Sequence, residues 1–286
     1  MQVVVLGHTG FLGGSIQRDL QRKGFPVLAA SSKECNLLEA DQLPRFFSRI
    51  SGPFQVVFCA GIARRVDDSF QSMLQNIYMV YHVACAVRER PLRSLIYLSS
   101  ADVYGPHPSL PITERTPPAP ANFYGLSKLC GEQLLRVSGL ISCPVTIIRL
   151  PGVYGPGDAG RSIVGRFLAE MEQRGRVTVQ GEGEVRRDYV EVGDVCEVVG
   201  LLLKGPYDGV LNVATGVSYT IRELIAILTE VSGLLPAVQY VSSAKPLAGD
   251  LVFEVSRLRS LLGGLRLKTL REGVQNYLIS RSTGRE

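Results

Sequence analysis

The sequence predicts an α/β protein with a doubly wound parallel sheet and a smaller mixed α/β lobe at its C-terminal side. Three observations support this fold class. Short, almost wholly apolar runs alternate with longer stretches of helical period through the first 150 residues, a glycine-rich turn follows the first run, and helix-breaking residues cluster near residue 155. Runs without polar alternation are typical of parallel strands that helices cover on both faces.

The expected elements follow from these patterns. Right-handed crossover connections would join the first strands and helices into one sheet. Strands are expected at 2–6, 25–30, 55–59, 94–98 and 145–149, and helices at 11–23, 39–50, 70–90 and 123–138. After the breakers we expect a helix at 161–174, a strand at 176–180, a helix at 193–203, a strand at 209–213, a helix from Thr220 to Val231 that begins with a capping box to Glu223, and a final helix at 268–280.

These elements predict two domains. Residues 1–155 would form the first domain, with returning segments near 188–216 that include the strand at 209–213, and residues 156–286 would form most of the second. The 286 residues are long enough to bury a proper core in either arrangement.

Composition excludes several classes of protein. With 45% hydrophobic and 20% charged residues, the chain is neither disordered nor collagen-like. The net charge of +5 suits a small anionic ligand, but the basic residues are scattered, so no nucleic-acid partner is expected. The six cysteines and three histidines lack metal-ligand spacing, which predicts no metal site. No apolar stretch reaches 18 residues and no signal-peptide pattern precedes Val3, so we expect a cytoplasmic protein without a membrane partner.

The glycine-rich turn predicts a phosphate-binding site. Gly7 permits a tight turn, Gly10 lets the backbone approach a pyrophosphate, and Gly13 allows close helix packing. The N-terminus of the following helix offers free N–H groups. A plain glycine-rich turn is the alternative, but its place between the first strand and first helix favours dinucleotide binding on a Rossmann-type sheet. The expected cofactor-binding residues of this turn are Gly7, Thr9, Gly10, Phe11, Leu12 and Gly13.

The end of the second strand bears on the choice of cofactor. An NAD site usually carries an acidic residue there to bind the ribose 2′-hydroxyl. This chain has Ser31, Ser32 and Lys33 instead, which could hold a 2′-phosphate, so NADP is predicted. In the alternative, Lys33 is merely exposed and Glu34 binds the ribose, which would restore NAD.

A serine, a tyrosine and a lysine predict proton transfer. Ser100 ends the fourth strand, and Tyr124 and Lys128 are four residues apart, on one face of a helix. An ammonium beside a phenol lowers the phenol's pKa toward the working pH, so Tyr124 could exchange a proton with a substrate alcohol or carbonyl while Ser100 orients the same oxygen. This is the proton relay of hydride-transfer chemistry.

Taken together, these features resemble the extended short-chain dehydrogenase/reductase superfamily of nucleotide-sugar epimerases, dehydratases and reductases. The likeness runs over nearly the whole chain. It rests on the glycine turn, Ser-Ser-Ala-Asp-Val-Tyr-Gly at 99–105, Tyr-Gly-Leu-Ser-Lys at 124–128, and the runs at 149–157, 181–194 and 211–216.

The resemblance implies residue roles. Tyr124 would be the catalytic acid/base, Lys128 its partner that also holds the nicotinamide ribose, and Ser100 the hydroxyl that polarises the carbonyl. Asp194 would be structural. Further cofactor contacts are implied at Asn36, Leu37, Cys59, Ala60, Gly61, Ser99, Pro151 and Val153, and substrate contacts at Ser100, Asp102, Tyr124, Gly152 and Arg187, where Arg187 would bind a diphosphate.

Departures from the family pattern narrow the reaction. Ala101 stands where dehydratases carry an acid, so dehydration is not expected. The stretch 33–39 resembles GDP-fucose synthase, an NADPH-dependent 4-keto sugar reductase, yet Asp102 stands where that family carries a cysteine, and its histidine near Ser162 is absent. Asp102 either faces the sugar or caps its own turn. Gly152 replaces a common asparagine, which alters one substrate contact.

The predicted function is therefore hydride transfer from NAD(P)H to C4 of a nucleoside-diphosphate 4-keto-deoxy sugar, without epimerisation. An NAD-dependent nucleotide-sugar 4-epimerase would use the same residues and remains an alternative, and a non-catalytic NADP-binding regulator is a second one. The family often dimerises through helices such as those expected at 70–90 and 123–138, so a homodimer is predicted.

Overall fold

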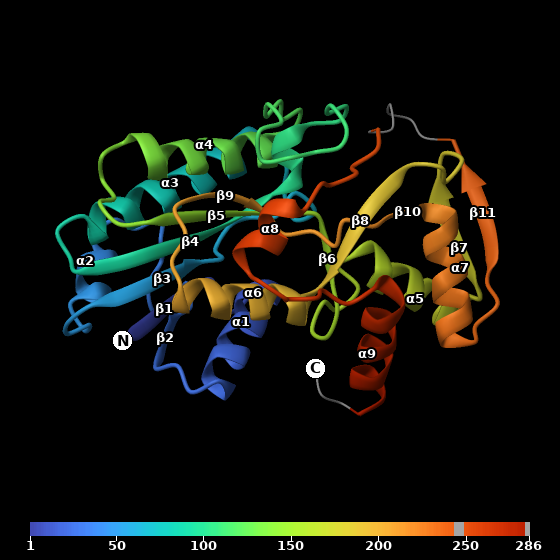
Figure 1. Cartoon of the computed structure of the whole chain (residues 1–286), viewed down its shortest axis with the longest axis horizontal. Coiled ribbons are helices and arrows are strands. Elements are labelled where there is room, and N and C mark those ends of the chain that lie inside the picture. The colour runs from blue at the N-terminus through green and yellow to red at the C-terminus, as the bar shows by residue number, and fades with distance from the viewer. Residues whose placement is uncertain (243–248, 284–286) are drawn as a thin grey trace. The chain divides into compact units, whose positions relative to one another are not determined.

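The computed structural model describes residues 1–242 and 249–283, which divide into two compact units (Figure 1). The first unit comprises residues 1–105, 118–149 and 196–211, and the second comprises 106–117, 150–195 and 212–286. The first unit therefore combines most of the chain up to Arg149 with a returning segment at 196–211, and the stretch 106–117 belongs to the second unit.

The first unit is built on a six-stranded parallel sheet with the order β2-β1-β3-β4-β5-β9. The predicted fold class is confirmed. The last strand of the sheet, β9, lies beside β5, as the sequence predicts for the strand near 209–213. The strands are β1 (Gln2–Leu6), β2 (Val27–Ala30), β3 (Phe54–Phe58), β4 (Leu92–Ser100), β5 (Val145–Leu150) and β9 (Gly209–Asn212).

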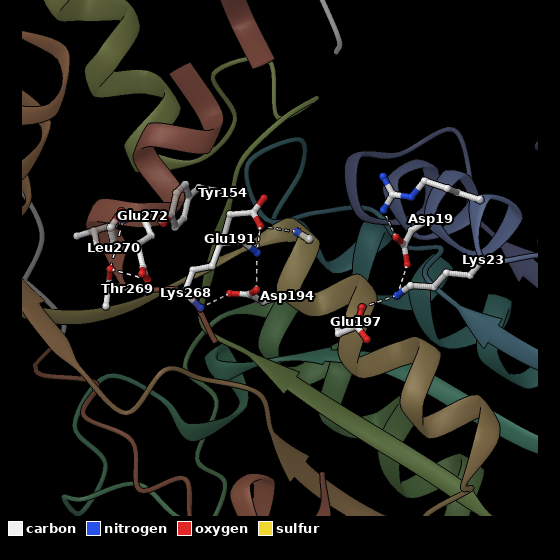
Figure 2. A network of polar contacts seen from close by, with 12 residues as sticks. Asp19, Lys23, Tyr154, Glu191, Asp194, Glu197, Lys268, Thr269, Leu270 and Glu272 are labelled. Atoms are coloured by element: carbon white, nitrogen blue, oxygen red, sulfur yellow. Dashed lines mark hydrogen bonds and ion pairs between the residues drawn. The ribbon is translucent and has the colours of Figure 1, made fainter. Parts of the chain in front are cut away.

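Helices cover both faces of this sheet. The α3 and α4 helices lie together on one face, and α1 and α6 lie on the other (Figure 1). Lys23 follows α1 and forms ion pairs with Asp19 at 2.8 Å and with Glu197 of α6 at 2.6 Å (Figure 2). The helices are α1 (Phe11–Arg22), α2 (Gln42–Phe47), α3 (Phe70–Val87), α4 (Phe123–Val137) and α6 (Val192–Lys204), and a short 3-10 turn, η1 (Ala101–Tyr104), follows β4.

The apolar strands predicted from the sequence form the core of this unit. Val3, Val4 and Val5 of β1 are fully buried, and so are Val56 and Val57 of β3. Because their side chains are covered on both faces of the sheet, no polar alternation is needed, which is why these strands are visible in the sequence.

The second unit contains two small sheets. One has the order β10-β8-β6, in which β8 is antiparallel to β10 and parallel to β6, and the other pairs β11 with β7 in parallel. Its elements are β6 (Gly152–Tyr154), β7 (Arg176–Gln180), β8 (Arg186–Glu191), β10 (Ser218–Thr220), β11 (Ala237–Val241), α5 (Ile163–Arg174), α7 (Ile221–Ser232), α8 (Ser256–Leu261) and α9 (Leu270–Ser282).

A polar cluster joins β8, the start of α6 and the start of α9 in this unit. Lys268 Nζ contacts Glu191 at 3.0 Å and Asp194 at 2.6 Å, and both carboxylates are buried (Figure 2). Asp194 also accepts the backbone N–H of Lys268 at 2.7 Å.

The predicted capping box at α7 is present, with the Thr220 side chain accepting from the Glu223 amide.

Two general properties concern the described residues, 1–242 and 249–283. Within them, no helix is long and apolar enough to cross a bilayer. In the same part of the chain, no group of three or more His, Cys, Asp or Glu residues is arranged to hold a metal ion. All six cysteines lie in it and are free thiols.

Candidate active site

The glycine-rich turn between β1 and α1 is closely packed. Gly7 has a φ of +87°, and a Cβ on it would lie 2.6 Å from the backbone of Ala60. A Cβ on Gly13 would lie 2.2 Å from the Gly7 carbonyl oxygen. At these two positions a side chain would collide with backbone, so glycine is required.

Gly10 is placed differently. A Cβ on it would meet the Gly7 carbonyl oxygen at an ordinary 3.5 Å. Gly10 is exposed and is the N-cap of α1, so no side chain caps the first amides of the helix. Exposed Thr9 and partly buried Phe11 and Leu12 flank it. Backbone N–H groups at a helix N-terminus that no side chain caps are free to bind a phosphate group.

The loop after β2 differs from the expectation in one respect. The backbone N–H and the hydroxyl of Ser31 donate to Glu34 Oε2 at 2.8 and 2.9 Å, and these bonds lower the pKa of Glu34. The Glu34 carboxylate therefore accepts both hydrogen-bond donors of Ser31, the residue that was expected to help hold a 2′-phosphate. Ser32 and Lys33 are exposed and remain candidates for that contact.

The side chains of Asn36 and Leu37 are engaged within the loop itself. Asn36 Oδ1 accepts the Leu38 amide at 3.1 Å, and the Leu37 side chain is buried in the core of the first unit. The buried, apolar side chain of Leu37 offers no polar group, so a cofactor contact at Leu37 would come from its backbone.

The loop after β3 contains Cys59, Ala60 and Gly61, and Asn76 of α3 holds it. The side chain of Asn76 accepts the Ile62 amide at 2.7 Å and donates to the Ile62 carbonyl at 3.0 Å. Its amide nitrogen also lies 3.2 Å from the hydroxyl of Ser127, next to Lys128 on α4. Sequence reasoning missed Asn76, because an asparagine inside an apolar helix carries no spacing signal for a partner.

The predicted Ser100, Tyr124 and Lys128 converge at the carboxyl end of β4. Ser100 and Tyr124 are hydrogen-bonded through their hydroxyl groups. Lys128 Nζ lies 5.7 Å from the Tyr124 ring centroid and donates to the Leu98 carbonyl at 2.8 Å. The three side chains come from two elements, β4 and α4, and Asn122 fixes the start of α4 by accepting the Gly125 amide.

Protonation at this site is governed mainly by burial. Desolvation lowers the pKa of Lys128 to about 8, against smaller opposing effects of Cys59 and Glu132. Desolvation also raises the pKa of Tyr124 above its ordinary value of 10, and Asp102 raises it further, while Ser100 and Arg64 lower it. That Lys128 lowers the pKa of the phenol stays a prediction. A protonated Tyr124 is suited to donating a proton.

A buried ion pair supports the same helix. Glu132, one turn after Lys128, accepts from Arg149 Nε at 3.0 Å and Nη2 at 2.6 Å. The Ser99 hydroxyl also donates to Glu132, and all of these side chains are almost wholly buried. The predicted cofactor residue Ser99 is thus held by α4, and no spacing pattern in the chain predicts this three-way contact.

Asp102 lies in η1, directly after Ser100. Its amide donates to the Ser100 hydroxyl at 3.1 Å, so the Ser100 side chain caps this turn. The Asp102 carboxylate lies 3.4 Å from Arg64 Nη1, and its side chain is 28% exposed. Asp102 therefore stands beside the hydroxyl pair of Ser100 and Tyr124.

The remaining predicted residues belong to the second unit. Gly152 and Val153 form β6 after Pro151, and Gly152 pairs with Tyr189 in the register of β6 and β8. A Cβ on Gly152 would lie 3.2 Å from the Tyr189 ring. Arg187 Nη1 donates to the carbonyls of Arg186 and Gly249, both at 2.7 Å.

The residues of the first unit fit a dinucleotide. The turn at Gly7–Gly13 can bind a pyrophosphate, since its backbone is exposed at Gly10 and the helix amides are uncapped. Tyr124 and Lys128 present a phenol and an amine of the kind that bind a nicotinamide ribose. Such a cofactor, when bound, supplies or accepts hydride.

Comparison with known proteins agrees with this geometry. Residues 3–214 match the model of the NAD dependent epimerase/dehydratase family. The chain belongs to this family. It is 30% identical over 246 residues to GDP-6-deoxy-D-mannose reductase of Pseudomonas aeruginosa, covering 81% of this chain and 80% of that protein. It is 28% identical to ADP-L-glycero-D-manno-heptose-6-epimerase of Alkalilimnicola ehrlichii, covering 96% of each.

Solved structures of the family share the fold. UDP-glucose 4-epimerase of Thermus thermophilus in complex with NAD superposes with a TM-score of 0.85 at 27% identity, over 98% of each chain. RMD from Pseudomonas aeruginosa complexed with NADPH gives a TM-score of 0.82 at 25% identity, over 98% of this chain and 99% of the other. The chain is accordingly an NAD(P)-dependent, nucleotide-sugar modifying enzyme, and both cofactors occur among its relatives.

Proposed function

We propose that the protein reduces the C4 carbonyl of a nucleoside-diphosphate 4-keto-deoxy sugar with NADPH. The observation that carries this proposal is the hydroxyl pair of Ser100 and Tyr124 beside buried Lys128 at the carboxyl end of β4. Reduction of a ketone needs a proton donor, whereas an epimerase must first remove a proton from an alcohol.

The residues of the chain would divide the work as follows. Ser100 donates a hydrogen bond to the substrate carbonyl oxygen and Tyr124 donates its phenolic proton as that oxygen becomes an alkoxide. The Lys128 amine, held against the Leu98 carbonyl, favours the phenolate that remains. In the second unit, Arg187 is the candidate partner of the substrate diphosphate.

Two relatives support reduction. GDP-6-deoxy-D-mannose reductase is 30% identical to this chain, and the RMD structure was obtained with NADPH. The runner-up is an NAD-dependent 4-epimerase, which the UDP-glucose 4-epimerase complex with NAD supports. A non-catalytic NADP-binding regulator is the third candidate.

The three candidates are separated by one screen. Purified protein is incubated with nucleoside-diphosphate 4-keto-6-deoxy sugars and either NADPH or NADH, and absorbance of the reduced nicotinamide is followed. Stoichiometric oxidation of added NADPH supports the reductase. Tightly bound NAD with interconversion of 4-epimers supports the epimerase. Turnover that is unchanged in Tyr124→Phe contradicts both catalytic proposals.

The preference for NADP is proposed on the exposed Ser32 and Lys33. Lys33→Glu should raise the KM for NADPH about tenfold or more and leave the KM for NADH within about twofold, because only NADPH carries the 2′-phosphate. Glu34→Gln is the companion variant, since it removes the carboxylate on Ser31 and should favour NADPH. A wild-type enzyme that strongly prefers NADH would overturn this preference.

We further propose a homodimer through α3 and α4. Phe70 and Tyr78 of α3 and Phe123 of α4 are exposed, and the rings of Phe70 and Phe123 are 6.2 Å apart. Exposed aromatic residues of this kind favour interfaces. Tyr78→Glu should shift the mass measured by light scattering from dimer to monomer, whereas a monomeric wild type would exclude the dimer. The cytoplasmic location remains a prediction.

A further inference from the structure

The amine of Lys128 lies over the ring of a second tyrosine. Its Nζ is 4.9 Å from the ring centroid of Tyr97, which directly precedes Leu98 on β4, and 5.7 Å from the ring centroid of Tyr124. The Leu98 carbonyl accepts one of its N–H donors at 2.8 Å. Two neighbouring residues of β4 therefore contact one ammonium, Leu98 through its backbone and Tyr97 through its ring.

The Tyr97 ring is fixed between the sheet and α4. Tyr97 is 2% exposed, and its ring centroid lies 5.5 Å from that of Phe58 on β3. A Cβ on Gly131 would lie 2.6 Å from the Tyr97 hydroxyl oxygen and 3.0 Å from its Cζ, so α4 packs directly against the end of the ring. Gly131 follows Lys128 by three residues and therefore lies on the same face of α4. A glycine at this position lets the helix that carries Lys128 approach the ring closely.

The ammonium is also shielded from water. Lys128 is 4% exposed, and a Cβ on Gly61 would lie 3.4 Å from its Nζ, so the loop after β3 packs against the amine. Glu132, the one acidic residue of α4, is engaged by Arg149 at 2.6 Å. An aromatic face within about 6 Å attracts a cation, and the attraction is stronger where water is excluded. The Tyr97 ring therefore has the position and the surroundings of a cation–π partner.

We propose that Tyr97 is a positioning residue whose ring face holds the Lys128 ammonium where it binds the nicotinamide ribose of the cofactor. Tyr97 acts through Lys128 in this role and needs no contact of its own with cofactor or substrate. The proposal rests on the predicted ribose contact of Lys128. It does not rest on the direction of the reaction, because a reductase and an epimerase would use the same contact.

Removal of the ring should weaken only those ligands that carry the second ribose. Tyr97→Leu leaves the Leu98 carbonyl as a partner of the ammonium but removes the aromatic face, so the dissociation constant of NADPH should rise about fivefold or more. Adenosine 2′,5′-bisphosphate lacks the nicotinamide ribose, and its dissociation constant should stay within about twofold of the wild-type value. Tyr97→Phe keeps the ring face and should restore NADPH binding to within about twofold.

The experiment is isothermal titration calorimetry of the full chain with three ligands. They are NADPH, 2′-phospho-ADP-ribose, which keeps the second ribose without the nicotinamide, and adenosine 2′,5′-bisphosphate. In Tyr97→Leu the first two should weaken together and the third should not. For an enzyme that prefers NADH, the corresponding ligands are NADH, ADP-ribose and ADP.

Two further variants separate the ring face from general packing. Phe47→Leu removes another fully buried ring from the core of the same unit, and it should leave all three dissociation constants within about twofold. Phenylalanine and trifluorophenylalanine at position 97 have nearly the same shape, but fluorine withdraws negative charge from the ring face. Affinity for NADPH should therefore fall from the first to the second, which tests the proposal even where Tyr97→Leu does not fold.

Three results would overturn the proposal. They are equal weakening of all three ligands in Tyr97→Leu, an affinity for NADPH that is as low in Tyr97→Phe as in Tyr97→Leu, and an affinity for NADPH that does not change on fluorination. If only the ligands with the second ribose weaken, but no nucleoside-diphosphate 4-keto-6-deoxy sugar is reduced, the role of Tyr97 stands and the proposed reaction fails.

Discussion

Burial of Lys128 should make the stability of the protein depend on pH in a way that one substitution removes. The Lys128 side chain is almost wholly buried, and burial lowers its pKa from 10.5 to about 8. Between these two values the unfolded chain holds a proton that the folded chain has lost. Stability therefore rises with pH through this window, by about 3 kcal/mol over the whole of it.

The substitution Lys128→Met keeps the unbranched stem and removes the charge. The hydrogen bond to the Leu98 carbonyl is lost at every pH, so that loss is constant, whereas the titration of the amine is not. The stability of the Met variant relative to the wild type should be higher at pH 7 than at pH 10 by about 2 to 3 kcal/mol.

The assay is guanidinium unfolding of both proteins at pH 7, 8, 9 and 10, with Lys204→Met as a control that removes an exposed lysine. Contributions of other titrating groups cancel in the difference between variant and wild type. A difference that stays constant within about 0.5 kcal/mol from pH 7 to 10 would refute the assignment of Lys128 as a buried, readily deprotonated amine.

Four further substitutions test the packing and the glycine-rich turn. Tyr189→Phe removes a buried hydroxyl without a hydrogen-bond partner among the described residues, so thermal unfolding should show a stability unchanged or higher by about 1 kcal/mol, and a loss of that size would contradict this. Gly13→Ala should lower the melting temperature because its Cβ would lie 2.2 Å from the Gly7 carbonyl oxygen. Gly10→Ala should keep the melting temperature of the wild type and weaken NADPH binding in a fluorescence titration. Equal melting temperatures of the two variants would count against the close packing at Gly13. Glu132→Gln should cost about 3 to 5 kcal/mol in chemical unfolding because it leaves the buried Arg149 guanidinium without its counter-charge, and a loss below about 1 kcal/mol would contradict that.

Much of the first unit could be predicted from the sequence, because its strands are buried on both faces and therefore apolar. In the second unit the sequence also predicts the helices at Ile163–Arg174, Ile221–Ser232 and Leu270–Ser282 and the strand at Arg176–Gln180, but it does not reveal the other strands. The strand at Arg186–Glu191 is polar at its start, and those at Gly152–Tyr154 and Ser218–Thr220 have three residues each, too few to show any period. The helix expected at 39–50 shortens to Gln42–Phe47.

The candidate active site also contains some contacts that could be predicted from the sequence and others that could not. Tyr124 and Lys128 could be paired from sequence because a helix places residues four apart on one face. Asn76 and Ser127 are 51 residues apart and belong to different helices, so only the folded chain shows their contact. Ser31 and Glu34 are only three residues apart, yet their hydrogen bond could not be predicted. It depends on a turn that brings the Glu34 carboxylate back to the end of β2, and composition does not determine the geometry of that loop.

The position of Asn76 on α3 has a consequence for assembly. The Asn76 side chain holds the loop after β3 by two hydrogen bonds to the Ile62 backbone. Tyr78 and Tyr81 on the same helix are exposed. If two copies pair through this helix, subunit association and the ordering of the cofactor loop share one rigid element. Diluting the protein until the dimer dissociates should then weaken its affinity for the nucleotide cofactor. The enzyme would release the cofactor at protein concentrations at which each subunit is still folded.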